Sequence, residues 1–134
     1  MIEYVVKHKL DDEEIKDILT TAIEGGISYW ACLGNDDEAW ENARTSYKER
    51  TNEIPYYCDV AFDVMNNGQA VIFYDEQDDD KKLAMSFGDF LNGCRLFEEK
   101  TGKCIHQMLD DGDFDAWDAD MIIQYAVFGE VIYG

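Results

Sequence analysis

The side chains that could do chemistry in this chain are mainly carboxylates, because 30 of its 134 residues are Asp or Glu. Only 11 are Lys or Arg, so the formal net charge at pH 7 is −19. The acids gather in four runs, at residues 11–14, 36–38, 75–80 and 110–120. The candidate partner-binding surface consists of Asp11, Asp12, Glu13, Glu14, Asp36, Asp37, Glu38, Asp75, Glu76, Asp78, Asp79, Asp80, Asp110, Asp111, Asp113 and Asp115.

Carboxylates spread over several elements of a folded domain can imitate the charge of a DNA duplex, which is about one charge per 1.7 Å of axis. Such a field attracts basic nucleic-acid-binding surfaces, speeds association and is weakened by salt. The alternative is that these acids are solvated loops and helix caps. Direct binding to nucleic acid or to anionic membranes is disfavoured, since that affinity comes from Lys and Arg.

The segment "DDGDFDAWDAD" raises the question of a calcium site. An EF-hand loop needs Gly at its sixth position and Glu at its twelfth. Counted from Asp111, these positions hold Ala116 and Ile122, so the pattern is absent. We therefore predict no metal site. A metal-dependent enzyme using Asp110, Asp111, Asp113 and Asp115 is kept as a third functional hypothesis.

Other catalytic or metal-binding patterns are weak. Cys104 and His106, with Cys94 or His8, lack the four-ligand spacing of a zinc site. No flanking signature marks a nucleophile, and "EGGIS" lacks the Lys of a phosphate-binding loop. We predict a protein that is not an enzyme and needs no cofactor.

The N-terminus and the cysteines indicate the compartment. "MIEYVVKHKL" has no uninterrupted apolar stretch after a basic start, and no apolar run of about 18 residues occurs elsewhere. We expect a cytoplasmic protein whose thiols are reduced and sit in or near the core. These thiols are Cys32, Cys58, Cys94 and Cys104.

Length and composition predict one folded domain, residues 1–134. The chain is 46% hydrophobic and 13% aromatic, which supplies a core despite the charge. Residues 2–8 are expected to form a first strand, and residues 11–26 a helix that Gly25 ends in a left-handed conformation. Residues 27–33 read as a buried strand, and residues 35–50 as either a capped helix or a mobile loop.

The second half continues this pattern of short elements. We expect a helix at 58–68, then strands at 69–76 and 81–86 that pair as a hairpin. Ser86 and Asp89 are placed to cap a helix that stops at Gly102. Residues 103–109 extend that helix or form a short helix or strand. Paired strands with separate helices indicate an α+β fold with a small antiparallel sheet.

The last helix is apolar on all sides. Asp115 or Asp118 caps it, Gly129 follows its end, and only Gln124 interrupts the apolar residues from Met121 to Phe128. A helix of this kind is buried in the middle of a domain. Gln124 then needs hydrogen-bond partners, and Asp120, one turn earlier, is in reach.

Two stretches carry a resemblance. A helix followed by Gly25, Gly26, Tyr29 and Trp30, together with "QYA-FGE--YG" at Gln124 to Gly134, resembles a family of small acidic proteins encoded by phages and integrative elements of Gram-positive bacteria. The resemblance implies a mobile-element context and a shared fold, and it carries over no catalytic residue. The two Gly are expected to turn the chain with positive φ, and the two ends of the chain to pack together.

These observations lead to a functional hypothesis. The protein is expected to inhibit a host-defence nuclease, as an anti-CRISPR or anti-restriction protein, by presenting a DNA-mimicking acidic surface to a CRISPR effector or restriction enzyme in the bacterial cytoplasm. The alternative is a phage accessory module for protein interaction or small-molecule binding, with acids that only solubilise it. An open apolar pocket lined by Tyr29, Trp30 or Trp117 would favour that alternative.

Overall fold

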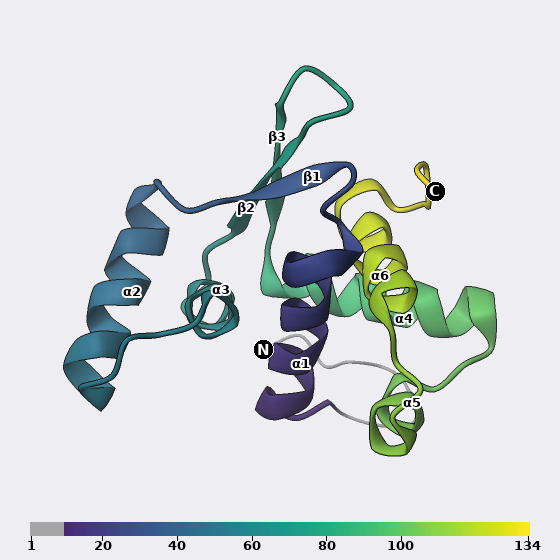
Figure 1. Ribbon diagram of the computed structural model, residues 1–134, viewed down its shortest axis with the longest axis horizontal. Coiled ribbons are helices and arrows are strands. Elements are labelled where there is room, and N and C mark those ends of the chain that lie inside the picture. Colours follow the sequence, from purple (N-terminus) through teal and green to yellow (C-terminus); the bar gives the residue numbers. More distant parts are fainter. Residues whose placement is uncertain (1–9) are drawn as a thin grey trace.

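The computed structural model describes residues 10–134, so the strand predicted at residues 2–8 lies outside the described part. A small sheet lies above the helices in the view of Figure 1, and its hairpin projects away from them. In chain order the elements are α1 (Asp12–Thr21), the π-helix η1 (Ala22–Gly26), β1 (Ala31–Gly34), α2 (Glu38–Thr51), α3 (Tyr57–Asn66), β2 (Val71–Asp75), β3 (Lys81–Met85), α4 (Phe87–Thr101), α5 (Ile105–Asp111) and α6 (Ala116–Phe128).

The sheet has three antiparallel strands in the order β1-β2-β3. The predicted hairpin is therefore confirmed, with β2 as the central strand. Phe73 of β2 is opposite Leu33 of β1 and Leu83 of β3, and it is fully buried. Alternating burial on β3 follows from the period of two along a strand.

The final helix α6 lies in the middle of the helical layer. It packs against α4 on one side and against η1 and α1 on the other (Figure 1). Ile122 and Ile123 on α6 are fully buried. The predicted α+β fold and the buried C-terminal helix are both confirmed.

Local capping explains where the helices begin and end. The Ser86 hydroxyl accepts from the Asp89 N–H, and the Asp89 carboxylate accepts from the Ser86 N–H, which makes the predicted capping box of α4. Asp115, rather than Asp118, is the N-cap of α6. Gly129 takes a positive φ after α6, which relieves the steric cost that a side chain would have there.

The first helix ends differently from the prediction. Gly25 is not left-handed, because α1 widens into the π-helix η1, which runs through Gly26. Gly26 is required for a different reason: a Cβ there would lie 2.7 Å from the carbonyl oxygen of Ala116 at the start of α6. This glycine serves close packing between η1 and α6 instead of positive φ.

The structure gives the secondary structure of three segments for which the sequence was ambiguous or imprecise. The strand expected at 27–33 is confined to β1, since residues 27–30 form a turn. The segment 35–50, open between helix and loop, contains most of helix α2. Residues 105–111 form the short helix α5. Within the described part of the chain, no helix is long and apolar enough to cross a bilayer.

We predict that Gly93→Ala destabilises the protein. A Cβ at Gly93 would lie 2.6 Å from the Ile122 carbonyl oxygen and 2.8 Å from the Ala126 Cβ, so α4 and α6 must move apart. Helix propensity alone would stabilise the variant by about 1 kcal/mol, whereas overpacking costs about 1–3 kcal/mol. Urea unfolding should show a net loss of stability, with the exposed Lys100→Ala as control. A Gly93→Ala variant as stable as the parent protein would contradict this packing.

Candidate functional site

Most of the predicted acidic surface is exposed to solvent. Asp75 is buried, Glu14 and Asp37 are partly buried, and the other predicted carboxylates are exposed. Most of the exposed ones lie at helix starts or in turns and loops, whereas Asp110 and Asp111 lie in the last turn of α5, where no helix N-terminus stabilises their charge. Exposure to solvent therefore holds for these acids except Asp75, Glu14 and Asp37, and their binding of a partner stays a prediction.

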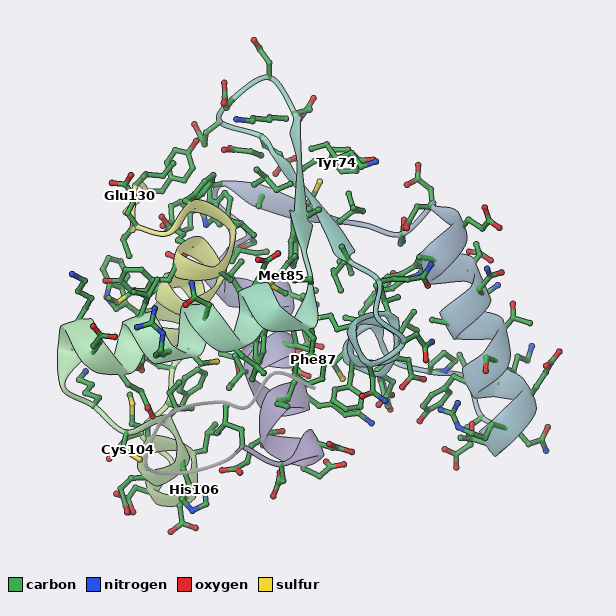
Figure 2. The ribbon with its side chains drawn as sticks, turned by 180° about the vertical axis from the view of Figure 1, so that it is seen from behind. Tyr74, Met85, Phe87, Cys104, His106 and Glu130 are labelled. Carbon is green, nitrogen blue, oxygen red and sulfur yellow. The ribbon has the colours of Figure 1, made fainter. Side chains whose placement is uncertain are left out.

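Two of the acidic runs meet where α1 begins and α5 ends. Glu14 Oε2 of α1 lies 2.5 Å from His106 Nδ1 of α5. Asp11 and Asp110 are close enough to raise the pKa of His106 further, after the larger effect of Glu14. Figure 2 places the labelled His106 at the lower end of the molecule. We call Asp11, Asp12, Glu13, Glu14, Asp110 and Asp111 the α1–α5 acidic end.

A third run forms the turn of the β2–β3 hairpin, at the opposite end of the molecule (Figure 1). The Lys81 N–H donates to the Asp78 carbonyl, which closes a tight turn around Asp79 and Asp80. Both central residues have positive φ, 52° and 55°, as in a type I′ turn. Such turns favour Asn-Gly or Asp-Gly, so Asp79 suits the first central position, whereas Asp80 takes the second position, where Gly would cost less. We call Glu76, Asp78, Asp79 and Asp80 the hairpin tip.

The remaining run, residues 36–38, lies at neither of these places. Ala31 pairs with Asp75 at one end of β1, whereas Gly34 pairs with Ile72 at the other end. Residues 36–38 therefore follow the end of the sheet that is farther from the hairpin tip. The acids form separate groups and not one continuous stripe.

The prediction that Asp75 belongs to the acidic surface is wrong, because its side chain is buried and only 1% exposed. Its Oδ2 accepts from the Tyr133 hydroxyl at 2.8 Å, and its Oδ1 accepts from the Gln77 N–H at 3.0 Å. The hydrogen bond to Asp75 raises the pKa of Tyr133 to about 12. Asp75 thus attaches the C-terminal tail to the sheet and offers no charge to a partner.

Asp115 also has a structural role, although it is exposed. Its Oδ1 accepts from the Asp118 N–H at 3.1 Å, and this backbone hydrogen bond lowers the pKa of Asp115. Asp118 completes the box and is 5% exposed, and its burial raises its pKa. The two carboxyl groups cap α6.

The exposed acids are not neutralised by salt bridges with Lys or Arg. Within residues 10–134, such salt bridges use carboxylates outside the predicted set, namely Glu41, Asp59, Asp63, Glu99 and Asp118. Among the predicted acids, Glu14 is paired, and its partner is His106. The predicted surface therefore keeps its negative field.

Beneath this surface lies a buried polar network centred on Asp120, which is 2% exposed. Its Oδ1 accepts from Trp30 Nε1 at 2.8 Å and from Gln124 Nε2 at 2.9 Å, and its Oδ2 accepts from the Tyr29 hydroxyl at 2.6 Å. Three donors compensate for the loss of water around this carboxyl group. The predicted contact between Asp120 and Gln124 is confirmed.

Gln124 extends the network to the C-terminal tail. Its Oε1 accepts from the Ile132 N–H at 2.8 Å and from the Tyr133 N–H at 2.9 Å. The Tyr133 ring lies 5.3 Å from the ring of Trp30. The two stretches that carry the family resemblance thus pack together as predicted. Burial, followed by the hydrogen bond to Asp120, raises the pKa of Tyr29 to about 12.

A pocket of about 550 Å³ lies between the end of α1, η1, the first half of α2 and the start of α3. It is not lined by Tyr29, Trp30 or Trp117. Its residues are Thr20, Ile23, Glu24, Trp40, Arg44, Pro55, Tyr56, Tyr57, Cys58 and Val60. Sequence reasoning missed this pocket because its walls come from three separate segments. The available signal was the apolar run "IPYY" at residues 54–57, directly after a polar helix.

The structure also shows where the possible metal ligands and the four thiols lie. Within the described part of the chain, no three His, Cys, Asp or Glu side chains converge on a point that could hold a metal ion. Cys94 is buried, and this burial raises its pKa; Cys32 is exposed, contrary to the expectation for the thiols. All four thiols are free.

Comparisons of the chain with models of protein families, with curated proteins and with solved structures find no match.

We predict that Asp120→Ala strongly destabilises the fold. The substitution leaves the buried Trp30 indole without its acceptor and removes one acceptor each from the Tyr29 hydroxyl and the Gln124 amide, which costs about 2–4 kcal/mol. Denaturant unfolding followed by Trp fluorescence measures this loss. Asp113→Ala, which removes an exposed acid from the loop before α6, should change stability by about 0.5 kcal/mol or less. Equal effects of the two substitutions would disprove the structural role of Asp120.

The contact between His106 and Glu14 predicts a pH dependence. Because the pKa of His106 is raised in the folded state, its contribution to stability is complete below the unfolded pKa of about 6.5 and is lost as pH rises through the folded value. The melting temperature of the parent protein should exceed that of His106→Gln at about pH 6 and approach it at about pH 8.5. A difference that grows with rising pH would have the wrong sign.

Proposed function

We propose that this protein is a non-enzymatic inhibitor that binds the basic nucleic-acid-binding surface of a host-defence nuclease, such as a CRISPR effector or a restriction enzyme, in the bacterial cytoplasm. One observation carries the proposal. On a folded domain of charge −19, thirteen of the sixteen predicted acids are exposed, and all sixteen lie outside the Lys and Arg salt bridges of the described residues. Such a surface competes for the sites where phosphates would bind.

The arrangement of the acids supports a two-point contact. The α1–α5 acidic end and the hairpin tip lie at opposite ends of the molecule (Figure 1). A long basic cleft that normally holds a duplex presents positive charge along its length, so it can engage both groups at once. Each group alone would bind weakly, and the two together act as linked contacts.

The hairpin tip gives a further reason to assign it a role in binding. Asp80 occupies the second central position of the turn, with positive φ, where Gly is the preferred residue. Backbone strain of this kind is often retained at functional sites. In the proposal, this strain is retained because it presents two adjacent carboxylates to the partner.

Charge-neutralising variants test the proposal. One set carries Glu76→Gln, Asp78→Asn, Asp79→Asn and Asp80→Asn in the hairpin tip. The second set carries Asp12→Asn, Glu13→Gln, Asp110→Asn and Asp111→Asn in the α1–α5 acidic end. Binding to candidate nucleases is measured at about 50 mM and about 200 mM salt, together with protection of phage or plasmid DNA. Each set should slow association about tenfold or more at the lower salt, and less at the higher salt.

A matched control removes the same number of charges elsewhere. Asp17→Asn, Glu49→Gln, Glu53→Gln and Glu130→Gln neutralise exposed acids outside both groups. This control should bind and protect almost as well as the parent protein. The proposal fails if the parent protein binds none of the nucleases, or if the control loses as much affinity as the two test sets, because the effect would then reflect net charge alone.

A further inference from the structure

The pocket beside η1 has the size and lining of a small-molecule site. Its volume of about 550 Å³ falls within the range of ligand pockets. Ile23, Pro55 and Val60 provide apolar walls, and three aromatic side chains complete the lining. Ile23 and Glu24 belong to η1, and π-helical turns occur frequently at functional sites.

The aromatic side chains of the pocket range from buried to largely exposed, so they form both its floor and its rim. Trp40 is 2% exposed, and its ring lies 6.2 Å from the ring of Tyr57. Tyr57 and Tyr56 are 56% and 78% exposed, and the neighbouring Ile54 is 82% exposed. Exposed apolar groups clustered around a concave site are typical of binding surfaces.

The charges at the pocket favour a cation. Glu24 is exposed, and its carboxylate makes no hydrogen bond or ion pair with the other described residues. Arg44, the basic residue in the lining, has its Nη2 3.4 Å from Glu41 Oε2, so its charge is partly compensated. With a net charge of −19, the surrounding field attracts cations and repels anions.

We propose that this pocket binds a small organic cation that carries an alkylated ammonium group. The alkyl groups pack against Trp40, Tyr56 and Tyr57, and Glu24 balances the positive charge. Aromatic faces attract such cations through the negative potential of the ring, and alkylated ammonium groups are bound in this way by aromatic cages. The site is separate from the acidic groups assigned to the nuclease, so the two proposals stand or fall independently.

The test uses choline as the probe and 3,3-dimethylbutan-1-ol, which has nearly the same shape without the charge, as its neutral counterpart. Chemical shifts of the Trp40 indole and of the backbone amides of Glu24 and Tyr57 are followed by NMR during titration. Choline should shift these signals with saturation, and the neutral alcohol should bind about tenfold more weakly or not at all. Acetate, as a small anion, should leave the signals unchanged.

Two variants locate the site. Glu24→Gln keeps the shape of the pocket and should weaken choline binding about tenfold, and Tyr57→Leu should weaken it by a similar factor. Glu53→Gln removes an exposed acid that does not line the pocket and should leave the affinity unchanged. Circular dichroism checks that each variant is folded.

Four outcomes would overturn the proposal. They are the absence of saturable shifts, equal binding of the neutral alcohol, shifts confined to the hairpin tip or the α1–α5 acidic end, and full affinity in Glu24→Gln. The third outcome would mean that choline only follows the general negative field.

Discussion

The fold depends on one buried carboxyl group, Asp120. It lies on the central helix and accepts hydrogen bonds from Trp30, Tyr29 and Gln124. Through Gln124 it holds the C-terminal tail, and the carbonyl groups of residues 29 and 30 accept in turn from Gln77 and from the Glu76 N–H of the hairpin. Four segments distant in sequence are thus attached to one polar centre. A buried polar group with all its partners in place favours one arrangement of the surrounding core, because any other leaves donors unsatisfied.

This centre separates structural acids from acids that are free to act on a partner. Asp75, Asp115, Asp118 and Asp120 hold the tail, cap the last helix or anchor the network. The exposed acids of the α1–α5 acidic end and of the hairpin tip sit on elements that these contacts keep in place. A charged surface of this kind repels itself, and such repulsion destabilises a compact state. The tightly packed α4–α6 contact and the network supply the stability that such a surface needs.

Features that depend on residues within one element could be predicted from the sequence. Most contacts between elements could not be predicted. The Ser86–Asp89 box, the end of α6 at Gly129 and the hairpin follow from residues a few positions apart. The reach of Asp120 to Gln124 was also predictable, because one helical turn separates them. The role of Asp75 was not, since its partner Tyr133 is 58 positions away. The role predicted for Gly26 was wrong for the same reason. A glycine is required there because the backbone of α6 passes too close for a side chain. The pocket has walls from α1, η1, α2 and α3, and no local pattern marks it.

Native-state hydrogen exchange of the Trp30 indole tests the central claim most directly. The N–H of this indole donates to Asp120 in the fully buried centre, whereas the indole of Trp117 is on a side chain that is 58% exposed. The account predicts that the Trp30 indole exchanges only when the whole domain unfolds, with the same free energy as the amides of Ile122 and Ile123. Exchange of the Trp30 indole at a rate close to that of Trp117, while those amides remain protected, would contradict it.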